Sequence, residues 1–243
     1  MKTTINTFII LIVTGVLITS GCKKTTNTNP GGGGATGLLK TMIQIVTTPN
    51  GTDTTTTNLV YDNQNRVVSQ IARTVINGNA IGIDTTTYTF GTNSVIQYSS
   101  ATQTSVTYTL NSQGFKASDN LGDSWAYNSA GYLTQGIQAS TGTTTTYTYN
   151  SSNELTGESA VSGSGTKTYN FTYSSNPIGH AGSSWNQGQS TGDLFDTEIE
   201  VIGGITTTLT ANYITNGQGQ LTQSTVQSNA PGSNPVVTYY IYY

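Results

Sequence analysis

Cys22 is the residue with the clearest chemistry in this sequence. It is the only cysteine among 243 residues, and it follows two small residues at the end of the apolar stretch 8–18. A charged start at Lys2, an apolar stretch too short to span a bilayer permanently, and small residues before a cysteine are typical of a bacterial lipoprotein export signal. We therefore expect residues 1–21 to be removed and Cys22 to carry a lipid that holds the chain at a membrane.

His180 is the only histidine, so a histidine metal site or a serine–histidine nucleophile pair would have to be centred on it. The surrounding sequence NPIGHAGSSW is rich in glycine and serine and has no metal-ligand spacing. We interpret His180 as a loop histidine, and we predict no catalytic residue there.

The densest acidic cluster is Asp193, Asp196, Glu198 and Glu200. In a strand, the last three of these would share one face, and the intervening Thr197, Ile199 and Val201 would take the other. Such carboxylates could bind Ca²⁺, but the cluster lacks the loop of a calcium-binding motif. We expect a solvated strand face and no metal.

Carboxylates also leave one enzymatic alternative open. Glu154 with Glu158, or members of the acidic cluster, could form the two-carboxylate pair of a hydrolase that acts on saccharides. The chain has no nucleophile–base arrangement and no cofactor motif. We therefore predict a protein without catalytic residues or cofactors, one that is not an enzyme.

Trp125 and Trp185 are the two tryptophans, and together with exposed tyrosines they could stack on sugar rings. These two side chains are our candidate ligand contacts. Packing inside a barrel is the alternative role for both.

The composition favours β-structure and excludes one class of partner. Charged residues make up 8% of the chain, against about 25% in a typical soluble protein, while threonine and tyrosine are abundant. Without Lys2 the chain has seven basic and 11 acidic residues, a net charge of 7 − 11 = −4. Nucleic acid is therefore not an expected partner.

Three parts of the chain can be separated by composition. Residues 1–21 are the predicted signal, and residues 22–37, with four consecutive glycines, are a predicted flexible tether. Residues 38–243 are predicted to form a single all-β domain.

One hairpin motif recurs along that domain. An aromatic or aliphatic residue is followed by Asn or Asp, two polar residues, Gly or Asn, one further residue and an apolar residue. The copies begin at Tyr61, Leu110, Tyr127, Tyr149 and Thr215, and the copy at Leu110 has its apolar residue one position early, at Phe115. Asn or Asp opens the turn, and the fourth position requires a positive φ. Asn65, Gly114, Gly131, Asn153 and Gly219 occupy that position.

The segments between these turns alternate aromatic or aliphatic residues with threonine. This period of two predicts antiparallel strands with a buried aromatic face and a wet threonine face. We expect a large up-and-down meander of about 14 to 16 strands, closed into a barrel that leaves no exposed edge. The interior of such a barrel is wider than its side chains fill, and segment 174–196, where the motif lapses, is predicted to line or plug it.

The motif resembles the tyrosine–aspartate repeats of Rhs-type proteins, through Tyr61-Asp62, Tyr127-Asn128 and Tyr149-Asn150. Together with the Cys22 signal, residues 216–226 (NGQGQLTQSTV) and residues 238–243 (TYYIYY), it resembles a family of bacterial lipoproteins of unknown function with a porin-like β-barrel fold. The resemblance implies a porin-like barrel, and it supplies no activity and no catalytic residues.

These observations predict a non-enzymatic barrel, lipid-anchored at the outer membrane, with a structural or ligand-binding role. A glycan or another envelope molecule is the expected ligand. A pore is the second alternative, because Tyr239, Ile241 and Tyr243 resemble the closing strand of outer-membrane barrels. An inserted barrel needs an apolar band about 25 Å tall, which the threonine faces do not supply, so we favour a water-soluble barrel on a lipid tether.

Overall fold

The computed structural model describes residues 38–48, 51–173, 195–218 and 220–242. These residues form sixteen strands, and no helix long and apolar enough to cross a bilayer occurs among them. The strands are β1 (Leu39–Thr48), β2 (Gly51–Tyr61), β3 (Val67–Ile76), β4 (Asn79–Phe90), β5 (Ser94–Ser99), β6 (Thr104–Leu110), β7 (Lys116–Asp119), β8 (Ser124–Tyr127), β9 (Leu133–Gln138), β10 (Thr143–Tyr149), β11 (Leu155–Ser162), β12 (Gly165–Tyr173), β13 (Phe195–Ile202), β14 (Ile205–Thr215), β15 (Leu221–Ser228) and β16 (Val236–Tyr242).

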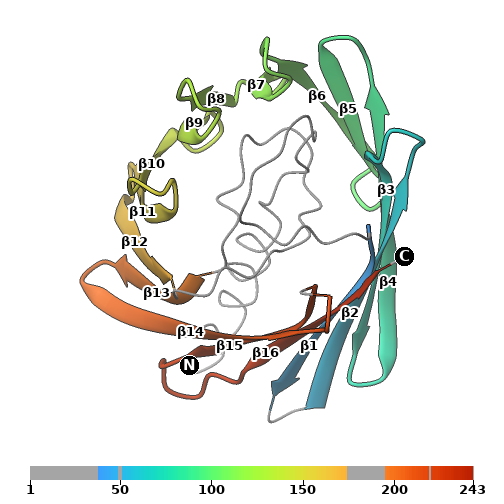
Figure 1. Ribbon diagram of the computed structural model, residues 1–243, viewed down its shortest axis with the longest axis vertical. Coiled ribbons are helices and arrows are strands. Elements are labelled where there is room, and N and C mark those ends of the chain that lie inside the picture. Colours follow the sequence, from blue (N-terminus) through green and yellow to red (C-terminus); the bar gives the residue numbers. More distant parts are fainter. Residues whose placement is uncertain (1–37, 49–50, 174–194, 219, 243) are drawn as a thin grey trace.

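The strands form one closed antiparallel barrel in which each strand pairs with its neighbours in sequence (Figure 1). The barrel closes between the first and last strands: Ile43 lies opposite Tyr239 and Ile45 opposite Val237. Because the number of strands is even, β1 begins and β16 ends at the same rim. The prediction of an all-β meander closed into a barrel of about 14 to 16 strands is therefore confirmed.

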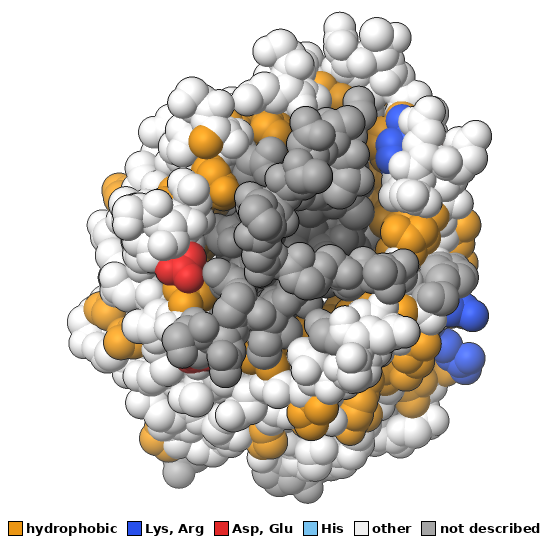
Figure 2. All heavy atoms as spheres, viewed as in Figure 1, with side chains coloured by type: hydrophobic (Ala, Val, Ile, Leu, Met, Phe, Trp, Pro, Cys, Tyr) orange, Lys and Arg blue, Asp and Glu red, His pale blue; other side chains and the backbone are white. Residues whose placement is uncertain are grey.

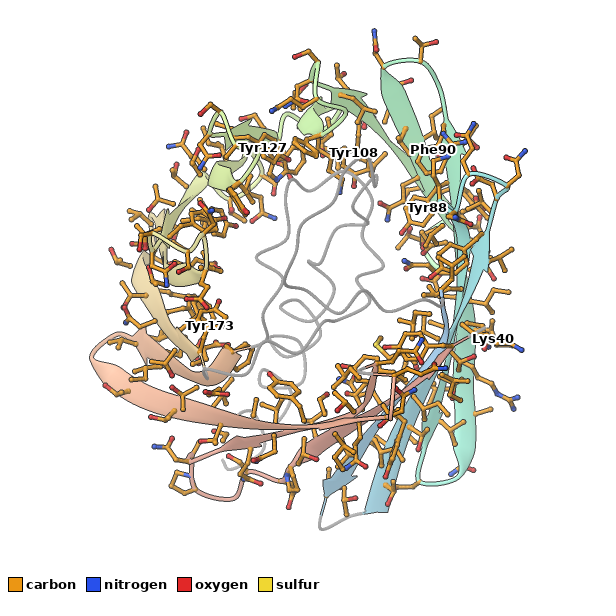
Figure 3. The ribbon with its side chains drawn as sticks, in the orientation of Figure 1. Lys40, Tyr88, Phe90, Tyr108, Tyr127 and Tyr173 are labelled. Carbon is orange, nitrogen blue, oxygen red and sulfur yellow. The ribbon has the colours of Figure 1, made fainter. Side chains whose placement is uncertain are left out.

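The two faces of the sheet differ as the period-two pattern predicted. Tyr88, Phe90, Tyr108, Tyr127 and Tyr173 point into the barrel, whereas Lys40 points outward (Figure 3). Since side chains alternate along a strand and cross-strand partners share a face, the register assigns the remaining positions. Threonines between the inward aromatic or aliphatic residues of β4, β6, β10, β12 and β14 consequently face outward.

The recurring motif forms the turns at the rim that holds both ends of the barrel. In the β2–β3 turn, Asp62 Oδ1 accepts hydrogen bonds from the backbone N–H groups of Gln64 and Arg66, each 2.9 Å long. The Asp62 N–H donates to the Arg66 carbonyl, and the Asn65 N–H donates to the Asp62 carbonyl. The same side-chain bonds form at Asn111, Asn128, Asn150 and Asn216.

The fourth turn position has the left-handed backbone that the spacing required. The φ angles are 60° at Asn65, 82° at Gly114, 88° at Gly131 and 64° at Asn153. Gly219 lies outside the described residues. A register shift follows each of these turns and lets the strand re-enter the sheet with increased twist.

The copy beginning at Leu110 keeps the register of the others, although its apolar residue, Phe115, falls one position early. Lys116 occupies the inward position that is held by Val67, Leu133 or Leu155 in other copies. Its ammonium group lies 4.1 Å from the centre of the Tyr108 ring, and Phe115 packs on Tyr127 with ring centres 5.2 Å apart. A cation over an aromatic face replaces the aliphatic contact of the other copies.

Tyrosine hydroxyl groups connect neighbouring strands at this rim. Each of these tyrosines lies near the end of an even-numbered strand. Its hydroxyl group donates a hydrogen bond to the backbone carbonyl of the first residue of the preceding strand. The bonds run from Tyr61 to Leu39 (2.7 Å), from Tyr149 to Leu133 (2.7 Å), from Tyr173 to Leu155 (2.8 Å), from Tyr213 to Phe195 (2.7 Å) and from Tyr242 to Leu221 (2.9 Å). We call these five bonds the tyrosine latches.

Segment 174–196, expected to line or plug the interior, falls largely outside the described residues, which resume at Phe195. Phe195 and Asp196 are the first two residues of β13, and Phe195 lies opposite Tyr173. These two residues therefore belong to the barrel wall.

The tyrosine latches should contribute measurably to stability. Tyr149→Phe removes one donor while keeping the ring, so we expect the free energy of unfolding to fall by about 1 kcal/mol. Urea unfolding measures the change. The control is Tyr98→Phe, because the Tyr98 side chain faces outward and is 39% exposed; there the change should stay within about 0.5 kcal/mol. Equal effects at both positions would contradict a role for the hydroxyl.

Candidate functional site

Three glutamates lie together on the inner wall, on strands β11 and β13, with β12 between them. In register, Tyr147 lies opposite Glu158, Glu158 opposite Tyr169, and Tyr169 opposite Glu200. This row crosses four strands on one face of the sheet. Because Tyr173 points into the barrel and Tyr169 lies four positions earlier on the same strand, the whole row faces inward (Figure 3).

Glu198 lies beside this row, two positions before Glu200 on β13. It is opposite Phe171 of β12 on one side and Leu209 of β14 on the other. Both of these neighbours are buried apolar residues. We call Glu158, Glu198 and Glu200 the glutamate wall.

Burial is the main cause of the unusual electrostatics of this wall. Glu198 is 1% exposed, and its Oε1 atom has no hydrogen-bond partner; the buried Oε1 of Glu200 also lacks one. Loss of water, followed by repulsion from Glu200 and Glu158, raises the pKa of Glu198 to about 7. Burial also raises the pKa of Glu158. Near neutral pH, Glu198 therefore exists in both its neutral and its charged form.

The pKa values of the tyrosines beside the glutamate wall are raised as well. Burial raises the pKa of Tyr169 well above its usual range, with further contributions from the charge of Glu200 and a hydrogen bond to it. Burial and then the charge of Glu158 raise the pKa of Tyr147. Both phenols therefore remain protonated and can donate hydrogen bonds.

No positive side chain neutralises the glutamate wall within the part of the chain that the structure describes. Among the described residues, the ion pair that is present lies in the β2–β3 turn. It joins Arg66 Nη2 to Asp62 Oδ2 at 2.7 Å. Lys167 faces inward on β12, but its cross-strand partner is Ile202. Lys116 is on a different wall, where burial lowers its pKa to about 8. Glu198 Oε1 and Glu200 Oε1 are thus buried acceptor atoms that no donor of the described barrel satisfies.

Metal binding finds no support in this arrangement. Among the residues that the structure describes, no three His, Cys, Asp or Glu side chains lie close enough to hold a metal ion. His180 and Asp193 are outside those residues. Glu198 and Glu200 lie on one face of β13, and Thr197 and Ile199 lie on the other face, as the alternation predicted. The expectation of a solvated face is wrong at Glu198, which is buried.

The candidate ligand contact Trp125 lies on the inner side of β8. Its ring packs against Tyr108 with centres 6.0 Å apart, and it adjoins the cluster formed by Val95 and Tyr108. The Lys116 ammonium group is 5.7 Å from the Trp125 ring. Trp185 and Cys22 are outside the described residues, so the structure does not bring Trp125 and Trp185 together.

The two glutamates proposed for a saccharide hydrolase are separated by the fold. Glu154 is in the β10–β11 turn, where it accepts a hydrogen bond from the Asn150 amide, whereas Glu158 lies on the inner wall. The sequence did contain a signal for the glutamate wall. Strands β10 and β12 alternate tyrosine with threonine, and glutamates of β11 and β13 fall on the tyrosine face once the register is known.

Solved structures place this architecture among known folds. The chain is similar to a porin-like protein from Bacteroides uniformis, with 16% sequence identity and a TM-score of 0.64 over 90% of this chain and all of the other. The fold is porin-like. A porin-like protein from Bacteroides vulgatus is similar at 9% identity and a TM-score of 0.59, over 85% of this chain and 99% of the other. No protein family model and no curated protein matches the chain.

The porin-like barrel implied by the sequence resemblance is therefore confirmed. At these identities the likeness concerns the fold alone. The lipidation of Cys22 and the likeness to Rhs-type repeats stay predictions.

The buried Glu198 should make stability depend on pH. Its pKa in the folded barrel, about 7, is above the ordinary value of 4.5, so the folded state holds the proton more tightly. This tighter proton binding contributes roughly 3 kcal/mol to the free energy of unfolding below about pH 4.5. The contribution is lost as the pH rises through about 7. Urea unfolding of the unsubstituted chain and of Glu198→Gln across this window measures it.

The difference between the two chains isolates Glu198 from the neighbouring Glu158 and Glu200, which both chains retain. Glu198→Gln should remove most of the fall in stability between pH 5 and pH 8. An unchanged slope in the variant would show that Glu198 is ionised normally in the folded barrel.

Proposed function

We propose that this protein is a lipid-anchored β-barrel of the outer membrane that binds an envelope ligand on its inner wall and catalyses no reaction. The observation that carries the proposal is the buried carboxylate of Glu198, whose Oε1 has no hydrogen-bond partner. Buried polar atoms in folded proteins are almost always paired, and an unpaired carboxylate costs several kcal/mol. A ligand that donates hydrogen bonds would offset this cost.

The chemistry of the wall favours a glycan as that ligand. Glu158, Glu198 and Glu200 offer acceptors to sugar hydroxyl groups, and the Tyr147 and Tyr169 rings offer apolar surface with a donor at one end. Binding sites commonly combine aromatic walls with a few oriented polar groups in this way. The sequence anticipated a glycan from its aromatic content, and the glutamate wall supplies the polar part.

Hydrolysis is disfavoured by the same geometry. Glycoside hydrolysis requires two carboxyl groups that flank the scissile bond. The three glutamates project from β11 and β13 on one wall, so they would approach a bound sugar from one side. Glu154, a further candidate, is held in a turn by Asn150. A binding role needs no second carboxylate on the far side.

The outer wall favours a water-soluble barrel over an inserted pore. Outward positions of β10 and β12 are threonines and an asparagine: Thr144, Thr146, Thr148, Thr166, Thr168, Asn170 and Thr172. A lipid-facing band would need apolar residues at these positions around the whole circumference. The term "porin-like" describes the fold, and for this chain we infer a barrel held outside the bilayer.

A binding screen tests the proposed function. The lipidated chain, purified in detergent, should bind a member of a glycan array and should show a raised melting temperature with the same glycan. Glu198→Gln and Glu200→Gln should each weaken that binding about tenfold or more, the cost of losing a charged acceptor. Glu154→Gln is the matched control at the rim and should bind as the unsubstituted chain does.

Two outcomes would contradict this proposal. One is the absence of any bound glycan together with an unchanged melting temperature, and the other is equal loss of affinity in all three variants. Release of cleaved sugar from a bound glycan would instead support the hydrolase.

Planar bilayers test the pore. We expect no conductance steps after the detergent-purified chain is added, because the threonine-covered wall does not insert. Reproducible steps, with cation selectivity that Glu200→Gln reduces, would establish the pore in place of the tethered barrel.

A further inference from the structure

The outward-facing charges of strands β16 and β1–β4 are all positive. Lys40 points outward on β1 (Figure 3), and Arg73 faces outward on β3, opposite Thr56 and Ile83. No acidic residue occupies an outward position on these five strands. Figure 2 shows blue spheres beside orange ones on the side of the barrel where β1–β4 lie.

Apolar side chains surround these cations on the same side. One cross-strand row runs from Tyr239 to Ile43, Thr56, Arg73 and Ile83. The next row runs from Val237 to Ile45, Thr54 and Val75. Ile241 lies beside the first row and is 45% exposed; Tyr239 is 40% exposed and Ile83 is 64% exposed. We call the outward side chains of these two rows, with Lys40 and Ile241, the seam face.

The opposite wall has a different composition at the same depth. Its corresponding row runs from Thr146 through Ser159, Thr168 and Val201 to Thr206. Threonine and serine dominate this row, and neither a cation nor an aromatic residue is present in it. The apolar and basic character of the seam face is therefore local and does not encircle the barrel.

The seam face includes β1, the strand that follows the predicted lipid anchor in the sequence. Sixteen residues lie between Cys22 and Leu39, the first residue of β1. The 17 steps from Cys22 to Leu39, fully extended, span at most about 61 Å, and Lys23 and Lys24 directly follow the anchor. A surface tethered at this range meets the membrane at a high effective concentration, so a weak contact suffices to orient the barrel.

We propose that the seam face rests on the lipid bilayer that holds the anchor, with Lys40 and Arg73 directed at anionic headgroups and Tyr239 and its apolar neighbours at the interface. The inference rests on the proposed lipid anchor. Apolar residues flanked by basic ones are typical of surfaces that lie in the interfacial plane. A two-fold contact between copies would place cations against cations, which favours the bilayer over a second copy.

Lipid quenching of tryptophan emission tests this orientation. The lipidated chain is reconstituted into vesicles of phosphatidylethanolamine and phosphatidylglycerol whose acyl chains are brominated near the headgroup. Tyr239→Trp should lose at least about half of its added emission, because an interfacial ring lies within reach of the bromines. Thr168→Trp, in the corresponding row on the opposite wall, is the matched control and should be quenched little. Emission of the unsubstituted chain is subtracted from both.

Charge reversal supplies a second measurement. With Lys40→Glu and Arg73→Glu added to Tyr239→Trp, quenching should fall toward the control value, and vesicles of phosphatidylcholine alone should also lower it. A chain found free of vesicles after flotation would refute the anchor itself.

A vesicle-bound chain with equal quenching at positions 239 and 168 would refute the seam face alone. Disulfide-linked dimers formed by Tyr239→Cys on the vesicles would assign the seam face to a second copy and would equally overturn the proposal.

Discussion

The antiparallel pairing of β1 with β16 is the constraint on which the rest of the structure depends. It joins the first and last strands of a continuous sheet, so every strand has two neighbours and no row of backbone donors and acceptors is left at an edge. Closure also gives the sheet an inside and an outside. Aromatic residues on one face become an enclosed wall, and threonines on the other become the outer surface.

Local interactions at the rim where β1 begins and β16 ends support that closure. Each Asx turn satisfies its own backbone groups, and the register shift beside it adds twist that bends the sheet. The tyrosine latches then bond the carbonyl at the start of a strand to the tyrosine near the end of the next. Repetition of this unit explains how a chain with little charge and no disulfide in its described residues maintains a wide barrel.

The same closure creates the chemistry of the glutamate wall. On an open sheet, Glu198 and Glu200 would lie in water on a solvated face. Inside the barrel Glu198 loses its water, and its pKa rises to about 7. Closure also builds the outer surface. The pairing of β1 with β16 places the apolar outward residues of β16 beside those of β1, and together they form a surface that neither strand forms alone.

The sequence by itself determined much of the fold. The period-two pattern decided which residues of each strand share a face, and the spacing from Asp62 to Asn65, or from Asn150 to Asn153, determined the turns, because few residues tolerate positive φ. Only the tertiary structure decided that the glutamate face points inward, that Glu154 and Glu158 are apart, and that Lys116 keeps the register. The first outcome depends on closure of the sheet and the other two on the register of strand pairing, and local periodicity encodes neither.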